Sequence, residues 1–138
     1  MAEIVVGVDG SERSIAALEF AVVEAERRGV AVRAVTAWDY PLVAGLPGVV
    51  FPARPFRRQA AEALEDLLEV VRAVEEGHPD ADIEADLREG DAALVLLAAA
   101  DGADLLVVGA HHGRIGGRRV GGVTQEVLAK ARCPVVIV

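Results

Sequence analysis

The chain of 138 residues is poor in several residue types, and each shortage excludes a class of protein. Its single cysteine, Cys133, cannot form an internal disulfide, and no Cys/His cluster has the spacing of a zinc site. Its single lysine, Lys130, does not belong to a G-x-x-x-x-G-K-[ST] motif, so a P-loop is excluded. The formal net charge is −8, whereas nucleic-acid-binding proteins present a basic face. We therefore expect no nucleic-acid partner.

Long apolar runs are also missing. Hydrophobic residues make up 53% of the chain, but no run approaches the ~20 residues that span a bilayer. The N-terminus, "MAEIVVGVDG", lacks the basic region and the long apolar core of a secretory signal. We therefore expect a soluble, cytoplasmic protein with no membrane partner. A chain of this length is expected to form one domain, residues 1–138.

The residue pattern alternates between strands and helices. Strands are predicted at residues 3–9, 30–38, 82–89, 104–110 and 133–138. Helices are predicted from Ser11 to Gly29, over 56–76, from Asp91 to near Gly102, and over 123–132. The second helix is expected to bury Leu64, Leu67, Leu68, Val71 and Val74, and the last one Val123, Val127, Leu128 and Ala131.

This alternation predicts a doubly wound α/β fold. Residues 4–8, 105–108 and 135–138 are continuously apolar, which is typical of parallel strands covered on both faces. Right-handed crossovers then build one five-stranded parallel sheet. Ligands of such sheets bind beyond the carboxyl ends of the strands, where the winding direction reverses.

Residues 39–55 interrupt the pattern. Four of the six prolines and four of the five aromatic residues lie in or beside this segment. Such a composition predicts a long irregular loop, either a lid over a site or an apolar flap over the sheet.

A second exceptional segment is "GAHHGRIGGRRVGG", residues 109–122, which follows an apolar strand and precedes a helix. Its glycines allow backbone N–H groups to approach an anion closely, and the following helix adds the positive end of its dipole. Three arginines, Arg114, Arg118 and Arg119, can add charge-assisted contacts. The segment is interpreted as a phosphate site or, alternatively, as a flexible solvated connection.

Four further residues have both a functional and a structural interpretation. Asp9, at the tip of the first strand, can bind a ribose or a base edge or help to hold a metal, or it can form an Asx turn before the helix. His111 and His112 are interpreted as surface or phosphate-contacting residues rather than metal ligands, because no carboxylate cluster accompanies them. Packing is favoured over reactivity for Cys133, which precedes a proline and a buried strand.

The chain resembles the universal stress protein family over nearly its whole length. The resemblance is carried by "IVVGVDGSERSIAALEFA" and by "ADLLVVGAHHGRIGGRRVGGVTQEVLAKARCPVVIV". It implies a Rossmann-like sheet with strand order 3-2-1-4-5, which places the first and fourth strands side by side. It also implies a homodimer formed through the last strand, residues 134–138.

The resemblance implies an adenine-nucleotide site as well. The aspartate near the ribose matches Asp9, and the residue that packs against adenine matches Ala37. The phosphate loop matches Gly109, Gly113, Gly121 and Gly122, followed by Val123 at the helix start, with Val8, His112 and Thr124 as neighbours in the site. The ATP-binding branch of the family has Gly, two residues, Gly, nine residues, Gly and then Ser or Thr. Here the first two intervals are three and seven residues, and Gly122 replaces the hydroxyl residue.

The resemblance therefore predicts a small regulatory protein of the stress response. The expected ligand is ATP, or else AMP or another adenine nucleotide, with or without Mg²⁺. No catalytic base is positioned beside a nucleophile, so at most slow ATP hydrolysis is expected. One alternative is a dimeric interaction module that binds no nucleotide. The other, an enzyme related to adenine-nucleotide α-hydrolases, is disfavoured because the chain has no S-G-G-x-D-S motif.

Overall fold

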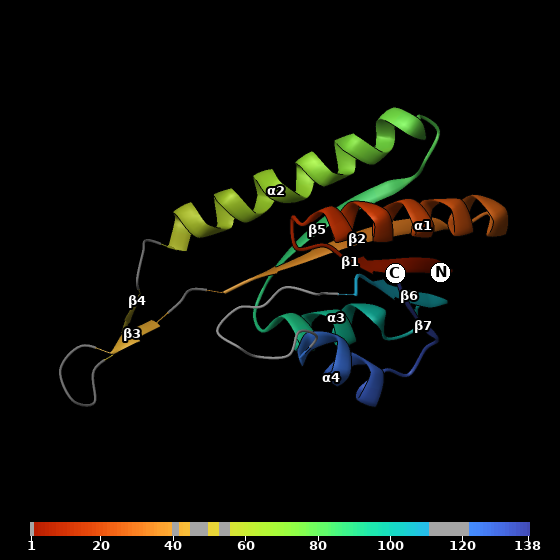
Figure 1. Cartoon of the computed structure of the whole chain (residues 1–138). Coiled ribbons are helices and arrows are strands. Elements are labelled where there is room, and N and C mark those ends of the chain that lie inside the picture. Colours follow the sequence, from red (N-terminus) through yellow and green to blue (C-terminus); the bar gives the residue numbers. More distant parts are fainter. Residues whose placement is uncertain (1, 40–41, 45–49, 53–55, 111–121) are drawn as a thin grey trace.

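A computed structural model of the chain describes residues 2–39, 42–44, 50–52, 56–110 and 122–138. Its main element is a five-stranded sheet in which every neighbouring pair of strands is parallel, in the order β5-β2-β1-β6-β7 (Figure 1). The strands are β1 (Glu3–Gly7), β2 (Ala31–Trp38), β5 (Ile83–Glu89), β6 (Leu105–Val108) and β7 (Val135–Ile137). Numbered among these five strands alone, the order is 3-2-1-4-5, so the predicted fold is confirmed.

Helices cover both faces of this sheet (Figure 1). One face packs against α1 (Glu12–Arg28) and α2 (Phe56–Gly77), and the other against α3 (Ala92–Ala100) and α4 (Gly122–Lys130). The side chains of β1 alternate between these two layers, because Ile4 and Val6 join the α1–α2 core whereas Val5 joins the α3–α4 core. The sheet is thus the middle layer of three.

Local capping chemistry sets the limits of the helices. The Ser11 hydroxyl accepts a hydrogen bond from the Ser14 N–H at the start of α1, and Gly29 ends this helix with a φ of 69°. Asp91 caps α3 by accepting from the Leu94 N–H. Each of these caps lies where the sequence pattern predicts a helix limit.

The edge strand β5 is polar on one side. Ile83 and Leu87 pack against the α1–α2 core. On the opposite side Asp86 forms two ion pairs. Its Oδ2 lies 2.9 Å from the Arg88 Nη2 and 3.7 Å from the Arg33 Nη1. The alternation in residues 82–89 therefore predicts a half-exposed strand correctly.

Two predicted helix faces need correction. In α2 the buried apolar side chains are Leu67, Val70, Val71 and Val74. Leu68 is only partly buried and Leu64 is 41% exposed, because both lie on the flanks of the buried stripe. In α4 only Val127 is buried, since this short helix packs against α3 and leaves Val123 and Leu128 largely in solvent.

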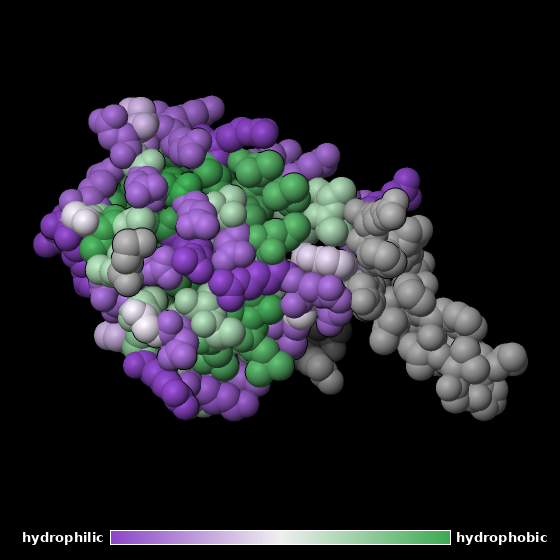
Figure 2. All heavy atoms as spheres, turned by 180° about the vertical axis from the view of Figure 1, so that it is seen from behind, coloured by the Kyte–Doolittle hydropathy of each residue, from purple (hydrophilic) through white to green (hydrophobic). Residues whose placement is uncertain are grey.

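The last strand also differs from the prediction. β7 is an edge strand, so only one of its sides is paired, and its residues are partly buried or exposed. Ile137 is 42% exposed. The sequence predicts that residues 135–138 form a strand covered on both of its faces. This prediction is wrong for β7 in the single chain, because none of its three residues is fully buried. Elsewhere, apolar side chains form patches between polar ones on the face shown in Figure 2.

The prediction of an irregular segment at residues 39–55 is only partly right. The described part contains two short strands, β3 (Leu42–Ala44) and β4 (Val50–Pro52), which pair antiparallel and stand apart from the main sheet (Figure 1). Their β-branched and aromatic residues favour strands despite the neighbouring prolines. The rest of the segment from residue 40 onward lies outside the described residues, and the choice between lid and flap stays open.

Candidate functional site

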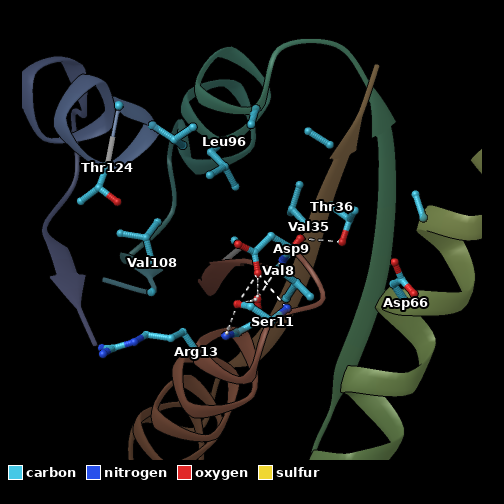
Figure 3. Close-up of a pocket in the computed structure, with 18 residues that line it drawn as sticks. Val8, Asp9, Ser11, Arg13, Val35, Thr36, Asp66, Leu96, Val108 and Thr124 are labelled. Atoms are coloured by element: carbon cyan, nitrogen blue, oxygen red, sulfur yellow. Dashed lines mark hydrogen bonds between the residues drawn. The ribbon is translucent and has the colours of Figure 1, made fainter. Parts of the chain in front are cut away.

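A pocket lies where the carboxyl ends of β1, β2 and β6 meet the amino-terminal ends of α1, α3 and α4 (Figure 3). The chain reverses its winding direction between β1 and β6, which is the place where open α/β sheets bind ligands. The pocket has a volume of about 390 Å³. Small-molecule sites usually measure roughly 300–1,000 Å³, so the volume suits a ligand of modest size.

The β1–α1 turn fixes the position of Asp9 in this pocket. The backbone N–H of Ser11 donates to Asp9 Oδ1 at 2.9 Å, and the hydroxyls of Ser11 and Ser14 donate to the same oxygen. In return, the Asp9 N–H donates to the Ser14 Oγ at 2.8 Å. The Asx turn expected at Asp9 is therefore present. The same contacts hold the carboxylate at the wall of the pocket, so the two interpretations of Asp9 are compatible.

The wall formed by β2 is mainly apolar. Val35 and Ala37 line it together with Thr36, which is only 7% exposed. The Thr36 hydroxyl donates to the Val8 carbonyl at 2.9 Å, and the Val8 N–H donates to the Val35 carbonyl at 2.9 Å. These bonds tie the ends of β1 and β2 together. The result is a rigid wall of small side chains, which suits the flat face of a ring.

The opposite wall suits an anion. It contains Gly109, directly after β6, and the first turn of α4. The early N–H groups of a helix have no intrahelical partner and carry the positive end of its dipole. Gly109 also packs closely on α1, because a Cβ at this position would lie 3.2 Å from the Cβ of Arg13. Arg13 lines the pocket beside Gly109, and its side chain extends away from Asp9 and Ser11 (Figure 3).

The predicted site residues divide into two groups. Seven of the ten line this one pocket, namely Val8, Asp9, Ala37, Gly109, Gly122, Val123 and Thr124. The other three, His112, Gly113 and Gly121, lie outside the described residues, as do His111 and the three loop arginines. The fold thus brings the ends of β1, β2 and β6 and the start of α4 to one place. That these residues bind a ligand stays a prediction.

Sequence reasoning missed five polar residues of the pocket, namely Ser11 and Thr36, described above, and Arg13, Ser14 and Asp66. Arg13 and Ser14 belong to the first turn of α1, and their position just after the first strand could have signalled them. Asp66 lies in the middle of α2, and nothing in its local sequence marks it. It reaches the pocket only because α2 passes over Gly10, where a Cβ would lie 3.4 Å from the Asp66 Cβ.

Other kinds of site find no support in the part of the chain that the structure describes. Within it, no three His, Cys, Asp or Glu side chains form a group that could hold a metal ion. Nor does any helix of these residues combine the length and hydropathy of a membrane span.

Cys133 packs beside the α3–α4 core, and burial raises the pKa of its thiol, although backbone hydrogen bonds at Cys133 and Leu106 oppose the shift. Its thiol is thus largely protonated at neutral pH, in line with packing.

Comparison with known proteins identifies the family. The model of the Universal stress protein family matches residues 1–138. The chain belongs to the universal stress protein family. A universal stress protein of Mycobacterium bovis is 37% identical over 137 residues, which are 99% of this chain and 45% of that relative. The chain of 138 residues therefore spans about half the length of the curated relatives that it matches.

Solved universal stress proteins have the same fold. One from Archaeoglobus fulgidus is 30% identical, with a TM-score of 0.74 over 99% of this chain and 93% of its own. Another, in complex with cAMP, is 27% identical, with a TM-score of 0.70 over 99% and 96%. An Archaeoglobus fulgidus protein in complex with dAMP is 26% identical, with a TM-score of 0.67 over 99% and 97%. Adenine nucleotides are thus ligands of two structural relatives.

Proposed function

We propose that this universal stress protein is a regulatory protein of the stress response that binds an adenine nucleotide, above all ATP. The observation that carries the proposal is the convergence of seven predicted residues, from four separate segments, on one pocket at the reversal of winding. The complexes of two structural relatives with cAMP and dAMP support the same ligand class. We further propose that residues 1–138 form one domain and act in the cytoplasm.

The two walls of the pocket suggest how the nucleotide lies. The adenine packs against the small apolar side chains of β2 at Ala37, and the ribose lies near Asp9. The phosphates lie on the other side, where Gly109 and the first turn of α4 offer backbone N–H groups. Any Mg²⁺ arrives with the phosphates, since the described residues offer no carboxylate cluster to hold one.

The proposed role is regulation rather than turnover. Among the described residues that line the pocket there is neither a histidine nor a cysteine. Its two serine hydroxyls donate to Asp9, an arrangement that shapes the turn and caps α1. A bound nucleotide is therefore hydrolysed slowly at most.

The nucleotide retained by the protein tests this function. Freshly purified protein is denatured, and the released small molecules are identified by mass spectrometry. Adenine nucleotide in the extract, with a melting temperature that rises with millimolar ATP, is the expected result. A protein that releases none and melts at the same temperature with and without ATP is instead an interaction module that binds no nucleotide.

Gly122→Ser is expected to raise the affinity for ATP about tenfold. The family's ATP-binding branch has a hydroxyl residue here, and one added hydrogen bond contributes roughly 1–1.5 kcal/mol, or about a factor of ten. A Cβ on Gly122 would meet no atom within 4 Å, so the side chain fits. Gly122→Ala is the matched control, because it adds the same Cβ without the hydroxyl. Equal affinities of the two variants in calorimetry would mean that the hydroxyl does not reach a phosphate.

We also propose a homodimer through residues 134–138. The edge strand β7 has one unpaired side, and Ile137 is 42% exposed, so a second copy can pair with this strand and cover the side chain. Ile137→Lys is expected to convert dimers to monomers in sedimentation equilibrium. Val23→Lys, at a 44% exposed apolar position on α1, is expected to leave dimers intact. A monomeric wild type, or a dimeric Ile137→Lys variant, contradicts this interface.

A further inference from the structure

The two sides of the pocket differ in charge. Asp66 lines it from α2 on the side of β2, whereas the other side has the positive end of the α4 dipole. Arg13 lines the pocket from α1, but its side chain extends away from Val8, Asp9 and Ser11 (Figure 3). Asp66 lies against the β1–α1 turn, because a Cβ on Gly10 would be 3.4 Å from its Cβ and 3.6 Å from its Oδ2. Arg13 lies against Gly109 at the far side, where a Cβ would be 3.2 Å from its own Cβ. A ligand that fills the pocket therefore meets the Asp66 carboxylate at one end and, at the other, Gly109 and the first turn of α4.

The two aspartates of the pocket are held differently. The Asp9 carboxylate accepts three hydrogen bonds from Ser11 and Ser14, which stabilise its charge. Asp66 makes no hydrogen bond or ion pair with any part of the chain that the structure describes. Its carboxylate is exposed at the pocket, where it depends on solvent or on the ligand for hydrogen-bond donors. This side of the pocket is therefore electronegative.

The charges fix the direction of a nucleotide, given the proposed function on which this inference rests. The 5′-phosphates belong beside the first turn of α4, since its N–H groups and the positive end of its dipole attract anions. The sugar hydroxyls and the base then face Asp66 across the pocket. Hydroxyl and amino groups can donate hydrogen bonds to its carboxylate, whereas a phosphate group at this end is repelled.

We propose that Asp66 is a specificity-determining residue of this pocket. It selects adenine nucleotides that carry no phosphate group besides those attached at the 5′ position. It rejects those that carry a further phosphate on the 2′ or 3′ oxygen. Asp66 acts here through the sign of its charge, so an uncharged side chain of the same shape removes the selection.

The experiment compares AMP with adenosine 3′,5′-bisphosphate, which differs by one phosphate on the sugar. Both ligands are titrated calorimetrically into the nucleotide-free wild type, Asp66→Asn and Glu65→Gln. Glu65 is the adjacent exposed carboxylate on α2. Glu65→Gln is the matched control, because it removes one negative charge, as Asp66→Asn does, but from a side chain that does not line the pocket. Circular dichroism checks that each variant has the wild-type fold.

The wild type is expected to prefer AMP, and Asp66→Asn is expected to reduce that preference about tenfold, mainly by tighter binding of the bisphosphate. Glu65→Gln is expected to retain the wild-type preference within about twofold, because solvent screens a charge outside the pocket. An Asp66→Asn variant with the wild-type preference, or an equal effect of Glu65→Gln, overturns the role of Asp66. If no variant and no wild-type protein binds AMP or ATP, the proposed function itself fails, and this inference fails with it.

Discussion

Ala37→Trp should weaken nucleotide binding by at least about a hundredfold while leaving the fold intact. Ala37 lies near the carboxyl end of β2, on the wall against which we place the adenine ring. An indole at this position would occupy much of the roughly 390 Å³ of the pocket, so the ligand would lose both its space and its packing surface. A hundredfold loss corresponds to about 2.7 kcal/mol, which is a reasonable value for one blocked subsite.

Calorimetry with ATP measures this loss, and chemical denaturation measures the stability of the variant. Ala73→Trp is the matched control, because Ala73 is exposed on α2 and does not line the pocket. It should bind ATP as the wild type does. If Ala37→Trp keeps the wild-type affinity, the adenine ring does not lie against β2, and the orientation proposed above is wrong.

Leu106→Ala should lower the free energy of unfolding by about 3 kcal/mol. Leu106 is fully buried in β6, between β1 and β7, and it belongs to the core beneath α3 and α4. Removing its side chain leaves a cavity between the sheet and the helices α3 and α4, where the closely packed neighbours cannot move far enough to fill it. The backbone ladder stays intact, so the variant should still fold.

Urea denaturation of wild type and variant gives this difference directly. Leu128→Ala is the control, because it deletes the same atoms from a side chain of α4 that is 51% exposed. Leu128→Ala should lower the free energy of unfolding by well under 1 kcal/mol. Equal losses for the two variants would mean that Leu128 is buried in solution, for example against a second copy of the chain.

Much of the fold follows from local sequence patterns. The five strands and four helices were predictable because apolar runs, Ser11, Gly29 and Asp91 mark their positions. The exposure of Leu64 and Leu128 was not predictable, because it depends on how far each helix overlaps the sheet. The β3–β4 pair could not be predicted, because the prolines and glycines of residues 39–55 indicate a loop, whereas only a few β-branched residues there indicate strands.

The candidate site was predictable only where residues follow a strand end. Asp9 lies two residues after the end of β1, and Gly109 directly follows β6. Because ligands of such sheets bind at the carboxyl ends of the strands, both residues were expected at the same site. The start of α4 was expected as well, because a helix follows the glycine-rich segment, whereas Ala37 was added by the resemblance to the family. Asp66 could not be predicted in this way, because only the packing of α2 over Gly10 brings it to the pocket.

Titration of ATP into nucleotide-free wild-type protein and into Ala37→Trp tests the central claim most directly. If the pocket between Asp9 and the β6–α4 connection binds the nucleotide, the wild type will give a saturable heat with one site per chain. The variant will then give little or no heat at the same concentrations. The claim is contradicted if the wild type gives no saturable heat with millimolar ATP, or if both proteins give the same binding curve.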